Sequence, residues 1–398
     1  MHATQLINTH LEKMCQGIHK KRMNALMSMV TACIQGKKLS VTGLGRSISN
    51  AVFEKHNIKR ADRLIGNPFL NQERGVFYTA MAKWIIGTHK QPVILVDWSD
   101  LSADGSFHLL RASLPVGGRA LPLYDEVHPQ KKSNNSDVEK QFLKKLKSLL
   151  PKQCRPIVIT DAGYRTPWFN AVQAQGWDFV GRVGGQTMIT PQSQGNWIRV
   201  EKIFDTATHR PRYLGFIDLV RCNPLACHAY LMKKKKQGRI KKTVYGKRCE
   251  MAHSVKSAKR ERTPWLIVTS LEGGTTITKR VMNLYKTRMQ IEEGFRDIKN
   301  SRWGFSLDEA KISTASRYEN LLLVGVLATF AVWLTGKVAE LKELHRQYQA
   351  NTVKTRNVLS TFYLGCRILN KKTLTFQRED FDRALSALKY QFEMQCHV

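Results

Sequence analysis

The sequence is poor in acidic residues. It has 31 Asp and Glu against 64 Lys and Arg among 398 residues, which gives a formal net charge of +33. So large a cationic excess in an otherwise globular chain indicates a polyanionic partner, and nucleic acid is the commonest one. A soluble basic protein without such a partner is the alternative. The charge therefore favours a nucleic-acid-binding protein.

Cysteine motifs and long apolar runs are also missing from the sequence. The eight cysteines are scattered and include no CxxC pair, and the N-terminus MHATQLINTHLEKM lacks the apolar core of a signal peptide. The most apolar segment, residues 321–335, is fifteen residues long, whereas a membrane span needs about 20 residues. We therefore expect a protein of the reducing cytoplasm, in which residues 321–335 form a buried helix.

Hydrophobic periodicity predicts helices at the two ends of the chain. Residues 1–88 have apolar positions at helical spacing and no convincing strand, which indicates a small helical domain. Residues 311–398 are helical again, and they are expected to pack on the rest of the chain or to form an oligomer interface. Their predicted helices lie near 317–335, 338–348, 353–369 and 379–393.

Residues 89–183 have strand periodicity and predict the α/β part of the chain. Three strands, a helix, a strand and a helix follow one another, which is the order of the ribonuclease H-like fold. The strands are expected at 91–97, 106–114, 119–127 and 155–160, and the helices at 136–150 and 167–175. Residues 184–276 break into short strands around a basic stretch, which indicates a β-rich insertion.

Two apolar runs in this α/β part each end in an aspartate. PVILVD ends in Asp97 and RPIVITD ends in Asp161. In the ribonuclease H-like order the first and fourth strands are neighbours, so both carboxylates are expected at the sheet edge where open α/β sheets place their sites. Asp97 is preferred to Asp100, which is expected to follow the strand.

A third carboxylate lies in the segment YKTRMQIEEGFRDIK, which predicts one helix. Tyr285, Arg288, Glu292 and Lys299 lie at offsets 0, 3, 7 and 14 of this segment. At about 100° per residue all four fall within about 60° of one helix face. Glu293 is rotated by about 80° from Tyr285. Glu292 is therefore the preferred carboxylate.

Three converging carboxylates are typical of a two-metal site for phosphoryl transfer. Mg²⁺ and Mn²⁺ prefer oxygen ligands, and two such ions about 3.5–4 Å apart need carboxylates to hold them. Asp97, Asp161 and Glu292 are therefore predicted to be both catalytic and metal-binding. Arg288 and Lys299 would then contact DNA phosphates, and Tyr285 could donate a hydrogen bond to one.

Two cationic segments are further candidates for DNA contact. HNIKRADRLIGNPFLNQERG predicts a basic helix with Lys59, Arg60 and Arg63, a turn at Asn67-Pro68 and a second helix, which together could dock on duplex DNA. KKKKQGRIKK has seven cations in ten residues and could contact phosphates. Solvated basic surfaces are the alternative for both segments. The second segment begins with Lys233, Lys234, Lys235 and Lys236.

The spacing Y-x2-R-x3-E-x6-K, together with VDWSD and TDAGYRTPWF, resembles the DDE transposases of bacterial insertion sequences. The resemblance is to the cut-and-paste family with the YREK signature, the IS-four family, and it includes DRLIGN and NTVKTRNVLS. It implies an end-binding domain in residues 1–88 and a ribonuclease H-like core that starts in residues 89–183. After the insertion at 184–276, the catalytic helix in residues 277–310 completes the core, and residues 311–398 form a helical region suited to dimerisation.

The resemblance also implies an activity, a cofactor and partners. Asp97, Asp161 and Glu292 match the DDE triad, which nicks the transposon end, forms and resolves a hairpin, and joins the end to target DNA. Two Mg²⁺ ions per site are implied, with Mn²⁺ able to substitute. The partners are inverted-repeat ends and target DNA bound by a homodimer, at the nucleoid of a bacterial cytoplasm. Trp265 matches the tryptophan that stacks on a flipped base, although a core tryptophan is an equal alternative.

Two other functions fit part of this pattern. A structure-specific nuclease would share the core but would not join DNA ends. A DNA-binding repressor derived from a transposase would bind the ends without cutting them. Three converging carboxylates favour an enzyme, because a repressor has no physical need for them.

Overall fold

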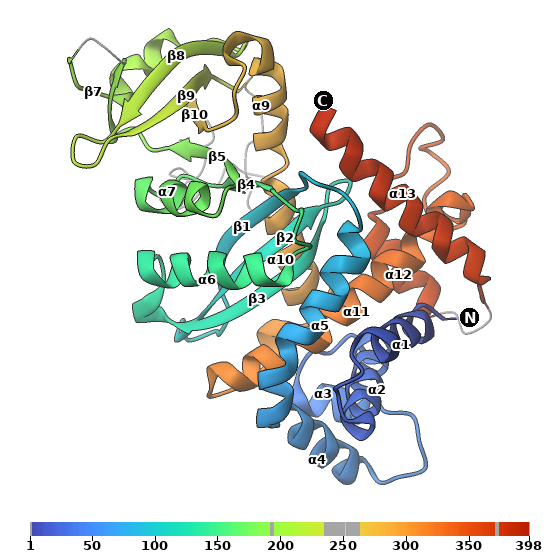
Figure 1. Ribbon diagram of the computed structural model, residues 1–398. Helices are drawn as coiled ribbons and strands as arrows, with labels where there is room; N and C mark the ends of the chain where they lie inside the picture. Colours follow the sequence, from blue (N-terminus) through green and yellow to red (C-terminus); the bar gives the residue numbers. More distant parts are fainter. Residues whose placement is uncertain (1, 192–194, 235–250, 252–262, 371–373, 398) are drawn as a thin grey trace. The chain divides into compact units, whose positions relative to one another are not determined.

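The computed structural model describes residues 2–191, 195–234, 251, 263–370 and 374–397. The fold is mixed α/β, with helices in the N-terminal and C-terminal parts of the chain (Figure 1). The chain divides into two compact units. The first comprises Met1–Pro156 and Thr287–Cys396, and the second comprises Ile157–Lys286 and His397–Val398.

The N-terminal part of the first unit is helical, as predicted for residues 1–88. Asn67 caps the last of its helices by accepting a hydrogen bond from the backbone N–H of Leu70, and Pro68 occupies the first helical position. The predicted turn at Asn67-Pro68 is therefore confirmed. The helices are α1 (Ala3–Met14), α2 (Lys20–Gly36), α3 (Val41–Arg46), α4 (Glu54–Ile65) and α5 (Pro68–Ile86).

Three antiparallel strands follow, in the spatial order β3-β2-β1. They are β1 (Val93–Asp100), β2 (Phe107–Pro115) and β3 (Ala120–Pro129), which confirms the three predicted strands. The prediction that β1 ends at Asp97 is wrong, because Trp98, Ser99 and Asp100 continue the register with β2. Residues 93–96 are buried, whereas residues 97–99 are only partly buried. The apolar run thus ends where burial ends, at residue 96, four residues before the strand does.

Two helices cover opposite faces of these three strands. α6 (Ser136–Leu149) lies on the face that carries Trp98 and Tyr124, since Trp98 Nε1 donates to Glu139 at 3.1 Å and Tyr124 stacks on Phe142 at 5.3 Å (Figure 1). α10 (Met289–Lys299) lies on the other face, where its Phe295 ring packs on the guanidinium of Arg111. Side chains alternate between the two faces along each strand, so the register decides which residues meet α10.

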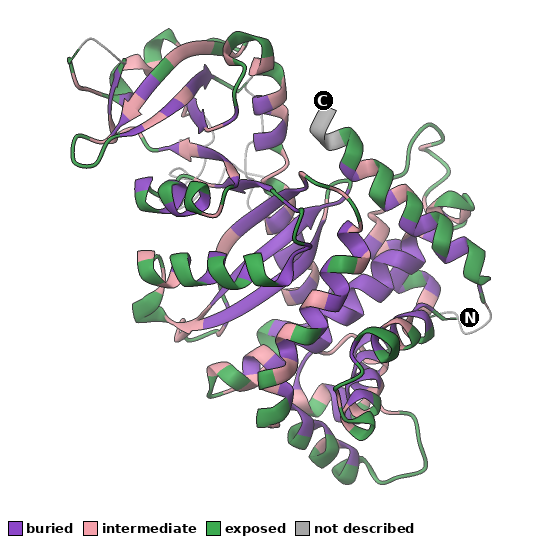
Figure 2. Cartoon of the chain, viewed as in Figure 1, coloured by how far each residue is buried: buried purple, intermediate pink, exposed green. Residues whose placement is uncertain are grey.

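The long helix α11 (Ala315–Leu341) forms the core of the first unit. By length and composition it could cross a membrane, but 94% of its most apolar window is buried within the protein, and Figure 2 shows it buried along most of its length. The predicted buried helix at 321–335 is confirmed, although α11 is longer than predicted and absorbs part of the expected helix at 338–348. A Cβ on Gly336 would lie 1.9 Å from the carbonyl oxygen of Thr361, so α11 packs backbone to backbone on the next helix.

Two helices complete the C-terminal part. They are α12 (Thr361–Leu369) and α13 (Arg378–His397). The helix predicted at 353–369 is therefore only half as long in the structure. The segment before it, from residue 350 to 360, has turns and bends instead of a helix.

The second unit has a mixed sheet in the order β4-β5-β10-β9-β8-β6-β7. β4 and β5 are parallel, and the other neighbouring pairs are antiparallel. The strand at 155–160 and the helix at 167–175 are confirmed as β4 (Ile157–Thr160) and α7 (Thr166–Ala174), whereas β5 was not foreseen. The other elements are β5 (Asp178–Val183), β6 (Met188–Pro191), β7 (Ile198–Arg199), β8 (Arg212–Leu219), β9 (Leu225–Met232), β10 (Trp265–Thr269) and α9 (Thr278–Lys286).

Glu126 joins β3 to α6 by a buried polar cluster. Its carboxylate accepts hydrogen bonds from Tyr124 Oη at 2.7 Å and His128 Nε2 at 2.9 Å, and it lies 2.9 Å from Lys145 Nζ. Burial alone would raise the pKa of Glu126, but these three partners more than offset it and lower the pKa to about 2. The ionised form of Glu126 therefore stabilises the fold.

Replacing Glu126 by Gln should lower the free energy of unfolding by about 2–3 kcal/mol at pH 7. A depressed carboxylate pKa contributes stability above the unfolded pKa of about 4.5, and this contribution is lost as the pH falls toward 2. Urea denaturation of both proteins between pH 7 and pH 3 should therefore show a difference that shrinks below pH 4.5. A difference that stays constant over this range would contradict the ionic origin of the effect.

Candidate active site

Asp97 and Glu292 meet at the guanidinium of Arg288. Arg288 lies immediately before α10, and its Nη2 donates to Glu292 Oε1 at 2.6 Å, one helical turn further along. Its Nη1 lies 3.6 Å from Asp97 Oδ2 on β1. Asp97 Oδ1 also accepts the backbone N–H of Trp98 at 2.9 Å. One cation thus balances two carboxylates that come from a strand and a helix.

The alternation of side chains separates Asp97 from Asp100. Asp100 lies three residues after Asp97 on β1 and therefore points to the opposite face. There Asp100 Oδ1 lies 3.2 Å from His108 Nδ1 on β2. The structure thus brings Asp97 to Arg288 and places Asp100 on the other side of the sheet.

Glu293 lies on a different edge of α10 from Glu292. Its carboxylate accepts a hydrogen bond from Arg296 at 2.8 Å and lies 3.5 Å from Arg119 Nη1. Arg119 also lies 2.8 Å from Asp297, so it fastens this edge of α10 to the loop between β2 and β3. Nothing in the sequence around Arg119 marked it as a partner of α10.

Lys299 joins the end of α10 to the end of β1. Its Nζ donates to Ser99 Oγ at 3.0 Å and to the backbone carbonyl of Asp100. Burial lowers the pKa of Lys299. Ser99 lies two residues after Asp97 and on the same face, so Lys299 and Arg288 both approach this face of β1. A phosphate contact of Lys299 stays a prediction.

The helix predicted to carry all four signature residues is broken in the structure. Tyr285 lies near the end of α9, and α10 starts at Met289. Between them the N–H groups of residues 290 and 291 bond three residues back, to the carbonyls of Thr287 and Arg288. The single-helix prediction is wrong. No Gly or Pro marks the break, and Thr287 only has a slightly lower helix propensity because its side chain is branched at Cβ.

Tyr285 and Trp265 pack together within the second unit. Trp265 on β10 is 7% exposed, and its ring centre lies 5.0 Å from that of buried Tyr285 in an edge-on contact. Lys234 Nζ lies 4.2 Å from the centre of the Trp265 ring, which is a cation–π contact. In this structure Trp265 is a core side chain, and stacking on a flipped base would require Lys234 to move.

Asp161 directly follows β4, as predicted. Its Oδ1 accepts the backbone N–H of Gly163 at 2.8 Å. Asp161 belongs to the second unit, whereas Asp97 and Glu292 belong to the first. In the part of the chain that the structure describes, no three His, Cys, Asp or Glu side chains are grouped so that they could hold a metal ion. The two-metal site stays a prediction, and carboxylate oxygens gathered around a cation have the chemistry that it requires.

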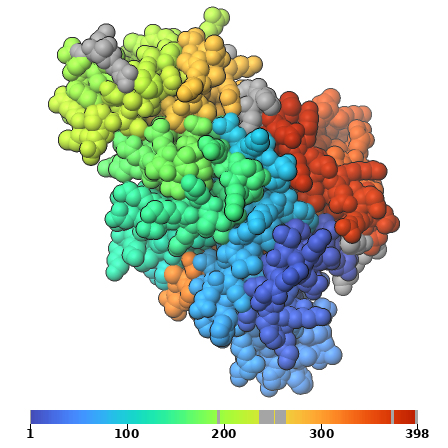
Figure 3. Space-filling view, viewed as in Figure 1, coloured from blue at the N-terminus to red at the C-terminus, as the bar shows by residue number. Residues whose placement is uncertain are grey.

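The cationic candidates for DNA contact that lie among the described residues are exposed to solvent. Lys59, Arg60 and Arg63 lie on the solvent side of α4, in the blue N-terminal part that is open to solvent in Figure 3. Lys233 and Lys234 are exposed and directly follow β9. The other two candidates of that segment, Lys235 and Lys236, lie outside the described residues.

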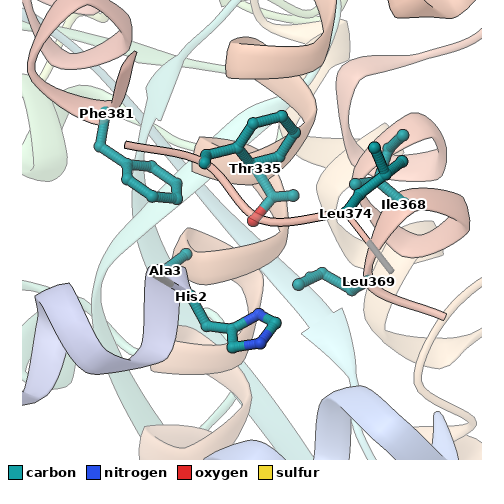
Figure 4. A pocket seen from close by; sticks show the side chains of 8 residues that line it. His2, Ala3, Thr335, Ile368, Leu369, Leu374 and Phe381 are labelled. Carbon is teal, nitrogen blue, oxygen red and sulfur yellow. The ribbon is translucent and has the colours of Figure 1, made fainter. Parts of the chain in front are cut away.

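A small cavity lies apart from Asp97 and Glu292, where the start of α1, the C-terminal half of α11, the end of α12 and the start of α13 meet (Figure 4). It is lined mainly by apolar side chains such as Ile368 and Phe381, with His2 and Thr335 at its wall. Its volume of about 10 Å³ is about the space of one water molecule. The cavity is therefore a packing gap and not a substrate site.

Comparison with known proteins identifies the class of enzyme. Residues 88–328, which are more than half of the chain, match the family described as Transposase DDE domain. The chain therefore belongs to the DDE transposase family and is an enzyme of that class, whose members use divalent metal ions.

The two other comparisons add less. No curated protein matches the chain. A similar solved structure is the cryo-EM synaptic complex of the piggyBac transposase with hairpin DNA, at 11% identity and a TM-score of 0.42. The match covers 93% of this chain and 76% of that chain.

Replacing Trp265 by Ala should destabilise the second unit by about 3–5 kcal/mol, because it leaves a cavity where a buried indole was. Trp265→Phe should cost less, since a ring remains beside Tyr285. Chemical denaturation followed by circular dichroism would measure both variants. Trp303→Ala is the control, because Trp303 is 47% exposed. Equal losses at Trp265 and Trp303 would contradict the core position of Trp265.

Proposed function

We propose that this chain is the transposase of a bacterial insertion sequence, in the cut-and-paste family with the YREK signature, the IS-four family. The observation that carries the proposal is the meeting of Asp97 and Glu292 around Arg288 within the matched DDE domain. The spacing of Tyr285, Arg288, Glu292 and Lys299 in the sequence supports the assignment to this family.

We also propose that the catalytic core is ribonuclease H-like. The order β1, β2, β3, α6, β4, α7 supports this, because it is the order of elements in that fold. In such a core Asp161 at the end of β4 joins Asp97 and Glu292. The domain boundaries at 88, 183, 276 and 310 belong to the same proposal, with a β-rich insertion before the catalytic helix.

Divalent ions would be held by Asp97, Asp161 and Glu292. Two Mg²⁺ ions, for which Mn²⁺ can substitute, would supply Lewis-acid stabilisation of the charge that develops during phosphoryl transfer. Arg288 now balances two of these carboxylates. Released from them, its planar guanidinium is suited to bind a DNA phosphate through two parallel hydrogen bonds.

The proposed reaction sequence is nicking of the transposon end, hairpin formation, hairpin resolution and strand transfer. Its partners are the inverted-repeat ends and the target DNA, bound by a homodimer at the bacterial nucleoid. Tyr285 and Lys299 would bind phosphates, and Trp265 would stack on the flipped base of the hairpin once Lys234 has moved away from its ring. Exposed Lys59, Arg60 and Arg63 support DNA contact by the N-terminal helices.

Asp97→Asn, Asp161→Asn and Glu292→Gln should each reduce Mg²⁺-dependent DNA cleavage by more than about 100-fold, because each removes a charged metal ligand. The substrate is DNA from the flanks of the chain's own gene, and a denaturing gel resolves nicks, hairpins and joined products. Asp100→Asn and Glu293→Gln are matched controls, since these carboxylates face other partners, and they should retain most of the activity.

The products also separate the alternative functions. Cleavage without joined products would indicate a structure-specific nuclease. Binding of the ends without any cleavage by the wild type would indicate a repressor. Full cleavage by Asp97→Asn would refute the proposed role of the triad.

DNA affinity should fall steeply with salt, because Lys and Arg displace counterions from phosphates. Replacing Lys59, Arg60 and Arg63 together by Gln should reduce the slope of log K against log salt by up to about 3. The DNA affinity is measured by fluorescence anisotropy of an end-sequence duplex. The salt concentration is varied between 50 and 300 mM, roughly the range in which such slopes are measured. The control changes three exposed lysines of α6, namely Lys140, Lys144 and Lys147. Equal slopes for the two variants would argue against a specific role of α4.

A further inference from the structure

Three charged side chains lie in a row across the strands beneath α10. Asp97 on β1 is the register partner of Arg111 on β2, and Arg111 is the register partner of Asp125 on β3. Residues directly opposite each other in a sheet point to the same face. The charges in this row therefore alternate between negative, positive and negative on the face of the sheet that α10 covers.

Arg111 and Asp125 form a buried ion pair with two parallel hydrogen bonds. Arg111 Nε and Nη2 donate to Asp125 Oδ1 and Oδ2, both at 2.7 Å. The two residues are 2% and 0% exposed. The remaining nitrogen, Nη1, is buried and has no hydrogen-bond partner among the described residues. Asp125 thus uses both oxygens for Arg111, whereas Arg111 keeps one donor group unused.

Phe295 of α10 holds the pair in place. Its ring centre lies 5.4 Å from the guanidinium carbon of Arg111 and 6.0 Å from Lys299 Nζ. The aromatic ring therefore contacts both the buried cation beneath α10 and the half-buried cation at the end of α10. Water is excluded from this side of Arg111, so its charge acts through a medium of low polarity.

Stability alone does not require this pair. Burying two charges is costly, and apolar residues of similar volume are often as stabilising as a buried ion pair. The pair does create a fixed dipole whose positive end lies one strand from Asp97, while its negative end lies two strands away. Neighbouring strands are about 4.8 Å apart. The Asp97 carboxylate is therefore closer to Arg111 than to Asp125, and the positive charge has the larger electrostatic effect on it.

We propose that Arg111 and Asp125 are positioning residues that hold the Asp97 carboxylate toward α10 and limit the strength with which it binds a divalent cation. The positive charge of Arg111 attracts the Asp97 carboxylate across the strands, while the two parallel hydrogen bonds of Arg111 go to Asp125. The same charge weakens the attraction of Asp97 for a cation, which allows the ion to be exchanged between successive reaction steps. This inference rests on the proposed function.

The test compares full-length variants by Mn²⁺ binding without DNA, measured by isothermal titration calorimetry. The double variant Arg111→Met with Asp125→Leu removes both charges at similar volume, and it should bind Mn²⁺ about threefold to tenfold more tightly because the positive end is lost. Its Mg²⁺-dependent cleavage should fall, since Asp97 is no longer held. A merely structural pair would leave Mn²⁺ affinity unchanged or lower it.

Two further proteins control for folding and for general charge effects. Arg111→Lys keeps the positive charge but loses one of the two parallel hydrogen bonds, so it should retain near wild-type Mn²⁺ affinity with reduced cleavage. Arg22→Met with Glu73→Leu removes a partly buried ion pair of the N-terminal helices, and it should leave Mn²⁺ affinity unchanged.

The outcomes separate this inference from the proposed function. Unchanged or weaker Mn²⁺ binding by the folded double variant would overturn the inference alone, provided that Asp97→Asn abolishes Mn²⁺ binding. Wild-type Mn²⁺ binding by Asp97→Asn, Asp161→Asn and Glu292→Gln alike would show that the bound ion is not held by the triad, and it would overturn the proposed function together with the inference.

Discussion

The guanidinium of Arg288 attracts two carboxylates at once, Asp97 from β1 and Glu292 from α10, and its positive charge offsets their mutual repulsion. Arg288 reaches Glu292 because the two are one helical turn apart, and it reaches Asp97 because α10 packs on that face of β1. Oxygen ligands that accept a guanidinium group also suit a hard divalent ion. Arg111 repeats the arrangement one strand further, between Asp97 and Asp125. Negative and positive side chains therefore alternate from Glu292 on α10, through Arg288 and Asp97, to the buried pair of Arg111 and Asp125.

The position of Glu292 depends on how α10 is fastened to the sheet. Arg119 holds the opposite edge of the helix through Glu293 and Asp297. A Cβ on Gly294 would lie 3.2 Å from the carbonyl oxygen of Ala120, so the helix approaches β3 closely. With one edge fixed in this way, the other edge directs its side chains to β1. Two neighbouring glutamates thus have different partners although they are adjacent in the sequence.

Local pattern predicted much of the secondary structure and most of the residues that meet on β1. The strands β1 to β4 and the helices α6 and α7 were foreseen, because their periodicity is regular. The end of β1 was misplaced, since the apolar run reports burial and not strand length. The break between Tyr285 and Arg288 was missed, because no Gly or Pro marks it and the hydrogen bonds that define it are visible only in three dimensions. The strands β5, β6 and β7 are short or weakly patterned, so they were missed as well.

The sequence by itself determined the charge of the protein, the periodicity of its elements and the spacing that lets Arg288 reach Glu292, because these are properties of composition and of helix geometry. Only the tertiary structure decided that Asp97 and Asp100 face opposite ways, since this depends on β1 continuing through Asp100 as a paired strand. It also decided that Arg111 lies between Asp97 and Asp125. Residues 97, 111 and 125 lie on three successive strands, and only the pairing of these strands places their side chains in one row.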